Sequence, residues 1–328
     1  MDTAIASANA NVALAKYWGK RDEVLNLPYT GSISVTMSGL TTTVRTTFGS
    51  GFREDRLFTN GEPAVDSVPA QRVSTFLELV RRLAGTKQRA EVEVQSNFPI
   101  ASGLASSAST FAALALSASH ALGLNLSPKE LSVLARRGSG SAARSIFGGY
   151  VEWLPGEASD GSDSYAVQLA APEHWNLGIV IAITDEGRKR VASREGMAHA
   201  VKQSPFFPTW LESHDADLDA VRRGIMERDL TLLGQTAEHN CLKMHAVSLG
   251  ARPSLLYWNP ATVAVIHRVR ELREEGLDAY FTIDAGPQVK VICPGTQRDA
   301  VARALERVPG VHRVLLSAPG GAAQLLET

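Results

Sequence analysis

Cysteine is scarce in this sequence of 328 residues, which contains only Cys241 and Cys293. Two cysteines exclude a disulfide framework as the organising principle of the fold. Neither sign of charge is in excess, because 33 Lys and Arg residues stand against 34 Asp and Glu residues. A net charge of −1 gives no general attraction to nucleic acid or to an anionic membrane. A local anion site is still compatible with these counts.

Long hydrophobic runs and a secretory leader are also missing. The longest apolar stretches, such as residues 177–183, have the length of a strand and are far too short to span a membrane. Residues 1–11 lack the basic start and the apolar run of a secretory signal. We therefore expect a cytoplasmic protein with no nucleic-acid or membrane partner.

Strand and helix patterns are mixed along the chain. Residues 32–36, 41–48 and 177–183 have the β-rich or apolar composition of strands, whereas residues 70–83 repeat apolar side chains at the helical period. Residues 127–130, Ser-Pro-Lys-Glu, predict a helix start with a capping box. Because strands and helices do not alternate strictly, the sequence favours an α+β fold over a doubly wound sheet.

The length is natural for two domains. Composition shifts at the charged segment 185–191. We therefore predict an N-terminal domain over residues 1–184 and a C-terminal domain over residues 185–328, with a site in the cleft between them.

The strongest local signal lies in residues 99–108, Pro-Ile-Ala-Ser-Gly-Leu-Ala-Ser-Ser-Ala. Gly103 permits close backbone approach, and free N–H groups at a helix start attract anions. Ser106 and Ser107 add hydroxyls for a phosphate or Mg²⁺. The segment lacks the Gly-Lys-Ser/Thr ending of a Walker A loop. A tightly packed Ala/Ser helix behind a glycine turn explains the same residues equally well.

A second Gly/Ser-rich segment spans residues 138–149 and contains Arg144. Its backbone N–H groups and hydroxyls suit an anion, and a guanidinium can bind a carboxylate or phosphate with two parallel bonds. The alternative is a flexible loop that carries a surface arginine.

Two further segments carry charge. Asp284 follows an apolar strand and precedes a Gly-Pro turn, so it either forms the turn or acts as a carboxylate in a cleft. Residues 16–22, Lys-Tyr-Trp-Gly-Lys-Arg-Asp, suit contact with an anionic small molecule. A solvated basic loop is the alternative for that segment, and residues 20–26 have the pattern of a polar loop.

Together these segments resemble the GHMP kinase superfamily and, within it, the diphosphomevalonate decarboxylase family. The resemblance rests mainly on residues 11–22, 97–108, 138–153 and 280–287, and it extends over residues 9–293. The first and third of these stretches contain the motifs specific to the decarboxylase branch, whereas the second is shared by the whole superfamily.

The resemblance implies two α+β domains with the active site between them. It also implies the conversion of ATP and 5-diphosphomevalonate into isopentenyl diphosphate, ADP, phosphate and CO₂, with Mg²⁺ as a cofactor and a homodimer as the assembly. A relative that decarboxylates 5-phosphomevalonate, or that only phosphorylates the 3-hydroxyl of mevalonate, is the enzymatic alternative. A non-catalytic binding protein with the same fold is the alternative of another class.

The resemblance also gives the site residues their roles. Asp284 would act on the substrate 3-hydroxyl, Arg144 would hold the substrate carboxylate, and Lys20 would take up charge on the phosphates. Arg194 departs from the family, whose segment usually carries Ser or Thr at this position; its positive charge would alter binding of the 5-phosphate end and leaves the choice between a diphospho and a monophospho substrate open. The implied substrate-binding residues are Tyr17, Trp18, Gly19, Lys20, Arg72, Ser139, Gly140, Ser141, Ala142, Ala143 and Arg144. The implied ATP-binding residues are Ser96, Asn97, Ser102, Gly103, Leu104, Ala105, Ser106 and Ser107, of which Ser107 is also the candidate contact for Mg²⁺.

Overall fold

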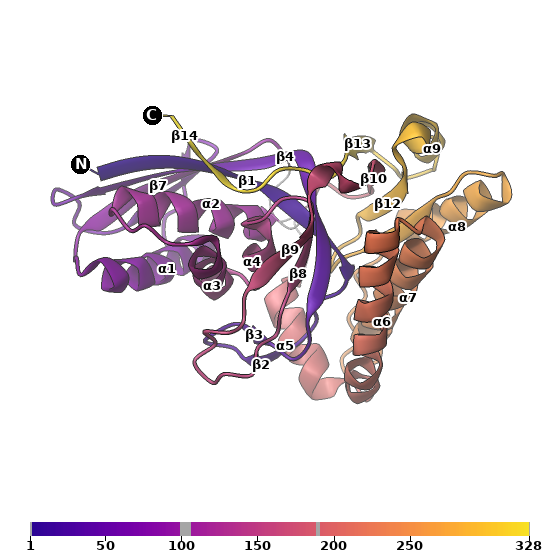
Figure 1. Ribbon diagram of the computed structural model, residues 1–328, viewed down its shortest axis with the longest axis horizontal. Coiled ribbons are helices and arrows are strands. Elements are labelled where there is room, and N and C mark those ends of the chain that lie inside the picture. The colour runs from indigo at the N-terminus through magenta and orange to yellow at the C-terminus, as the bar shows by residue number, and fades with distance from the viewer. Residues whose placement is uncertain (1, 99–105, 188–190, 328) are drawn as a thin grey trace.

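The computed structural model describes residues 2–98, 106–187 and 191–327. An eight-stranded sheet lies in the first half of the molecule, in the order β14-β1-β4-β7-β5-β6, with β8 pairing with β4 and β9. Its strands are β1 (Asp2–Ala15), β4 (Ser32–Gly49), β5 (Arg56–Thr59), β6 (Glu62–Pro63), β7 (Arg89–Ser96), β8 (Tyr150–Trp153), β9 (Ala166–Ala170) and β14 (Gln324–Leu326). Because β14 pairs with β1, the two ends of the chain lie at the same edge (Figure 1).

Helices cover one face of this sheet (Figure 1). They are α1 (Val68–Ala84), α2 (Ser106–Ala121), α3 (Pro128–Gly138) and the single turn α4 (Ala142–Ser145). α2 is buried because its small Ala and Ser side chains let it lie directly on the sheet, where Ser109 Oγ is 2.7 Å from Thr42 Oγ1. The predicted capping box is confirmed, with Ser127 and Glu130 bonding to each other's backbone N–H.

A four-stranded antiparallel sheet, in the order β11-β12-β10-β13, forms the second half. Its strands are β10 (Leu177–Ile183), β11 (Tyr280–Ile283), β12 (Val289–Pro294) and β13 (Arg313–Ser317). The helices of this half are α5 (Ser193–Gln203), α6 (Phe207–Glu227), α7 (Leu230–Leu249), α8 (Pro260–Glu274) and α9 (Arg298–Glu306).

β10 joins the two halves through its side chains. All seven of its residues are buried. Ile179 and Ile181 share a core with Leu14 and Ile33 of the large sheet, whereas Val180 packs in a separate core under α8 and α9. Burial on both faces explains why this strand is apolar throughout instead of alternating.

Two local predictions need correction. Residues 32–36 and 41–48 belong to one strand, β4, which pairs with β1 along nearly its whole length despite the left-handed Gly39. The segment 20–26 is not simply a solvated loop, because β2 (Lys20–Asp22) pairs with β3 (Leu27–Pro28) and Lys20 is buried. No helix within the described part of the chain is long and apolar enough to cross a membrane.

Candidate active site

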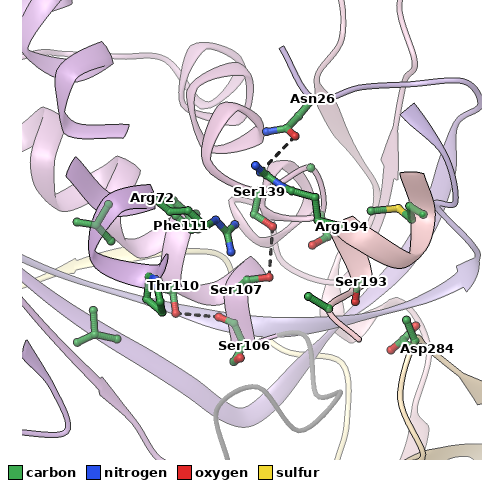
Figure 2. A pocket seen from close by; sticks show the side chains of 18 of the residues that line it. Asn26, Arg72, Ser106, Ser107, Thr110, Phe111, Ser139, Ser193, Arg194 and Asp284 are labelled. Carbon is green, nitrogen blue, oxygen red and sulfur yellow. Dashed lines mark hydrogen bonds between the residues drawn. The ribbon is translucent and has the colours of Figure 1, made fainter. Parts of the chain in front are cut away.

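A cavity of about 680 Å³ lies between the two halves. The end of β1, the start of α2 and the Ser139–Arg144 turn line it from the first half, and α5 and the residues after β11 line it from the second half. Figure 2 shows Asp284, Ser107 and Arg72 facing this space from three different elements. Segments that are far apart in sequence therefore meet here.

Asp284 stands between two buried lysines. Lys16 Nζ is 2.8 Å from Asp284 Oδ1, and Lys290 Nζ is 3.0 Å from Asp284 Oδ2. Both lysine side chains are almost fully buried, whereas the aspartate side chain is 24% exposed. Burial alone would raise the pKa of Asp284, but the two ammonium groups outweigh it and hold the pKa well below its usual range. The carboxylate is therefore ionised at neutral pH and open to the cavity.

Arg144 is held rigidly on α4. Its Nε donates to Ser34 Oγ at 2.9 Å and its Nη2 donates to Asn11 Oδ1 at 3.0 Å, with Nη1 bonded to Ser32. Burial lowers its pKa to about 10, so it stays charged at neutral pH. Among the described residues, no carboxylate lies within ion-pair distance of Arg144. A buried cation with only neutral partners suits an anionic ligand.

Three more cations line another part of the cavity: Lys20, Arg72 and Arg194. Arg72 donates to the Gly138 carbonyl at 3.0 Å and lies 4.9 Å from the Phe111 ring. Burial and the nearby charge of Arg194 lower the pKa of Arg72 to about 10. Burial likewise lowers the pKa of Lys20. Glu23 is ion-paired with Lys20 at 2.9 Å, whereas no carboxylate of the described residues lies within ion-pair distance of Arg72 or Arg194. Like charges repel each other unless an anion lies between them, so the cluster fits a ligand with several negative charges.

Hydroxyl groups lie between the cation cluster and Asp284. Ser107 Oγ, in the first turn of α2, is 3.3 Å from Ser139 Oγ (Figure 2). A Cβ on Gly140 would lie 2.8 Å from Tyr17 Oη, so only glycine allows the turn to pack against that ring. The start of a 16-residue helix, together with two hydroxyls, is a suitable place for phosphate oxygens.

Comparisons with known proteins cover both halves of the chain. Residues 8–166 match the model of the diphosphomevalonate decarboxylase-like N-terminal domain, and residues 179–316 match that of the mevalonate 5-diphosphate decarboxylase C-terminal domain. Human diphosphomevalonate decarboxylase is 36% identical over 316 residues, which cover 90% of this chain and 77% of that protein. The Candida albicans enzyme is 33% identical over an alignment of 349 residues, which covers 100% of this chain and 96% of that protein.

This chain belongs to the diphosphomevalonate decarboxylase family. The solved structure of mevalonate diphosphate decarboxylase from Staphylococcus aureus has a TM-score of 0.94 and 37% identity, covering 99% of this chain and 98% of that one. The enzyme from Enterococcus faecalis has a TM-score of 0.91 and 38% identity, covering 99% of both chains. The prediction of the family and of its two-domain α+β fold is confirmed.

Most of the residues predicted from the family resemblance line the cavity. They are Tyr17, Trp18, Lys20, Arg72, Ser106, Ser107, Ser139, Gly140, Ser141, Arg144 and Asp284. Ala142 and Ala143 are fully buried in α4 behind it, and Gly19 adopts a left-handed φ of 106° against Phe207. Ser102, Gly103, Leu104 and Ala105 lie outside the described residues. The roles of these residues stay predictions.

Ser96 and Asn97 are placed differently. Neither is among the described residues that line the cavity. The Asn97 side chain accepts from the Thr41 N–H and donates to the Gly39 carbonyl, and Ser96 donates its backbone N–H to Asn60. These contacts tie the end of β7 to β4 and to the turn between β5 and β6, and they leave the predicted nucleotide contact of both residues without support from the geometry.

Two charged residues beside Asp284 were not selected from the sequence. The motif of residues 16–22 assigns Lys16 no role of its own, and none of the sequence motifs above includes Lys290. Each follows or interrupts an apolar strand, Ala13-Leu-Ala15 or Val289–Ile292. A lysine in such a setting is almost never buried without a partner, so a carboxylate nearby could have been expected.

Proposed function

We propose that this protein catalyses the ATP-dependent decarboxylation of 5-diphosphomevalonate to isopentenyl diphosphate, with release of ADP, phosphate and CO₂. The observation that carries the proposal is an ionised Asp284, held by two buried lysines, in a cavity that also contains Arg144 and a separate cation cluster. Related structures support it. The Enterococcus faecalis enzyme is described as binding ATP in a mechanism mediated by mevalonate diphosphate. A second solved structure, 40% identical to this chain, is a complex with MVAPP, AMPPCP and magnesium.

Asp284 orients the substrate 3-hydroxyl toward the γ-phosphate of ATP. A bond forms between the 3-oxygen and the γ-phosphorus, the bond from that phosphorus to ADP breaks, and the hydroxyl proton leaves through the Asp284 carboxylate. A tertiary alcohol is a hindered nucleophile, so its position matters more than the basicity of the carboxylate. Lys16 and Lys290 fix the carboxylate from both sides and thereby fix that position.

The second step releases phosphate and CO₂. The bond between C3 and the phosphorylated oxygen breaks, the bond to the carboxylate carbon supplies the electron pair, and a carbon–carbon double bond forms. Arg144, which is held by Asn11 and two serines, fixes the substrate carboxylate opposite the leaving phosphate. This contact also stabilises the ground state, so its benefit is geometric.

The cation cluster and the apolar lining of the cavity each receive one of the remaining ligand groups. Lys20, Arg72 and Arg194 receive the diphosphate, which needs more positive partners than a monophosphate. Four apolar side chains from one packed cluster line the cavity beside Arg72 and suit the flat adenine base: Leu57, Val73, Val94 and Phe111. Mg²⁺ bound with ATP would neutralise charge on the phosphate oxygens, and Ser107 would be its contact in the protein.

The test is ATP-dependent release of CO₂ from purified protein, with 5-diphosphomevalonate and 5-phosphomevalonate assayed side by side. We expect CO₂ from the diphosphate. CO₂ mainly from the monophosphate would contradict the substrate assignment, and ADP without CO₂ from either would indicate a 3-kinase. Asp284→Asn keeps the shape of the side chain but removes its charge, so turnover should be lost while ATP binding, measured by calorimetry, is retained.

A homodimer, a cytoplasmic location and the division of the chain at residues 184 and 185 complete the proposal. The family resemblance supports the dimer, the composition supports the location, and the end of β10 at Ile183 supports the division. Light scattering of the purified protein tests the assembly.

A further inference from the structure

Helix α7 packs against the ends of both strands that carry the Lys16–Asp284 ion pair, β1 and β11. The fully buried Asn240 accepts a hydrogen bond on Oδ1 from the backbone N–H of Lys16 at 2.7 Å. On the same face of α7, Cys241 Sγ accepts from the backbone N–H of Ile283 at 3.1 Å, and His245 Nε2 is 3.3 Å from the Ile283 carbonyl. One helix therefore contacts Lys16 itself and the residue before Asp284.

The orientation of the Asn240 amide is fixed by its other partners. Nδ2 donates to Asp217 Oδ2 at 2.7 Å and lies 3.3 Å from His214 Nδ1. Asp217 is ion-paired with Lys243 at 2.6 Å, so it is an acceptor only. His214 Nε2 is 3.0 Å from the Gly31 carbonyl and must donate to it, which leaves Nδ1 as an acceptor. Because both partners accept, the NH₂ group faces them and Oδ1 must face Lys16.

We propose that Asn240 is a positioning residue for the reaction: by holding the backbone of Lys16, it sets Lys16 Nζ against Asp284. Lys16 follows directly after the last paired residue of β1, Ala15, so the strand ladder does not hold its N–H. Its side chain then spans to a carboxylate that lies 268 residues further along the chain. A small shift of that backbone moves the ammonium group away from Oδ1. Asn240 itself is not among the described residues that line the cavity.

The inference rests on the proposed function, and Asn240→Ala tests it. We expect kcat to fall by about a hundredfold, because a misplacement of about 1 Å at a reacting group costs that much. The KM for ATP should change little, since the hydroxyls and cations proposed for the phosphates lie on other elements.

A pH profile separates positioning from a merely structural role. Within the described ranges, five titratable groups interact electrostatically with Asp284: Lys16 after β1, Lys290 on β12, Arg144 on α4, and Cys241 and His245 on α7. The Asn240→Ala variant loosens only Lys16. Asp284 then loses part of its stabilising charge, its pKa rises, and kcat should fall at acidic pH values where the wild type is still flat.

Leu233→Ala is the matched control, because Leu233 is also fully buried on α7 but lies about two helical turns before Asn240. It should lose thermal stability while keeping the wild-type acid limb. If Asn240→Ala does not fold, Asp217→Asn carries the test: it keeps the shape, frees the amide to turn, and should lower kcat by about tenfold. A kcat within about threefold of wild type in the folded variant, or the same acid-limb shift in Leu233→Ala, overturns the proposal. Wild-type protein without CO₂ release would instead overturn the proposed function.

Discussion

Removing Lys290 tests whether the charge state of Asp284 controls turnover. In Lys290→Met the side chain keeps most of its length but loses an ammonium group 3.0 Å from Asp284 Oδ2. Two unit charges at that distance attract by about 1.4 kcal/mol in bulk water and by about 5.5 kcal/mol at an effective dielectric constant of about 20. Because the Asp284 side chain is 24% exposed, the true value lies between these limits.

The expected result is a shift of the acid limb of kcat. Burial of Asp284 already raises its pKa, and of its two lysine partners only Lys16 then remains to oppose that effect. Since about 1.4 kcal/mol corresponds to a tenfold change in proton binding, the limb should move upward by at least about one pH unit. Activity is lost as pH falls through the raised pKa, so the variant and the wild type differ most at acidic pH.

The assay is CO₂ release at saturating substrate from about pH 8 to about pH 3, because a pKa that starts well below the usual carboxylate value and rises by about one unit is detected only at the acidic end of this range. Lys202→Met, on the exposed side of α5, removes the same charge from the surface and serves as the control. Thermal unfolding at each pH shows that the variants stay folded. An acid limb at the wild-type position in Lys290→Met would refute the view that the two lysines together keep Asp284 ionised.

Three further predictions concern other parts of the site. Arg144→Lys keeps the charge but loses the forked geometry held by Asn11, so kcat/KM should fall by about tenfold to a hundredfold in steady-state assays; an unchanged value would contradict its proposed role. Arg194→Ala should raise the KM for 5-diphosphomevalonate more than the KM for ATP, and equal changes would exclude it from the diphosphate pocket. His245, whose pKa burial lowers to about 3, is neutral when folded but titrates near its ordinary value when unfolded. Stability present above about pH 6.5 is therefore lost at about 1.4 kcal/mol per pH unit on acidification, and chemical denaturation should show a shallower loss in His245→Gln.

Local features of the chain could be predicted because local forces decide them. The Ser127 capping box is encoded by residues three positions apart. The apolar run of β10 is unbroken because every residue of the strand is buried. The placement of residues 138–149 and of Asp284 as candidate site residues also follows from the sequence, because small residues, hydroxyls and an isolated charge in apolar surroundings are local signals. The sequence by itself thus determined the mixed fold and most of the segments that carry the chemistry.

The tertiary structure decided which charges meet. Lys16 reaches Asp284 only because β1 and β11 converge, although the two residues are 268 positions apart in the chain. Lys290 is six positions after Asp284 and reaches it through the pairing of β11 with β12. Lys20 likewise reads as a solvated charge in its own segment, whereas the structure buries it beside Glu23. Ser96 is predicted from the sequence to lie near the nucleotide, but in the structure its backbone N–H donates to Asn60 in the turn between β5 and β6. Periodicity encodes which face of an element is buried, whereas partners distant in sequence are fixed by how those faces pack.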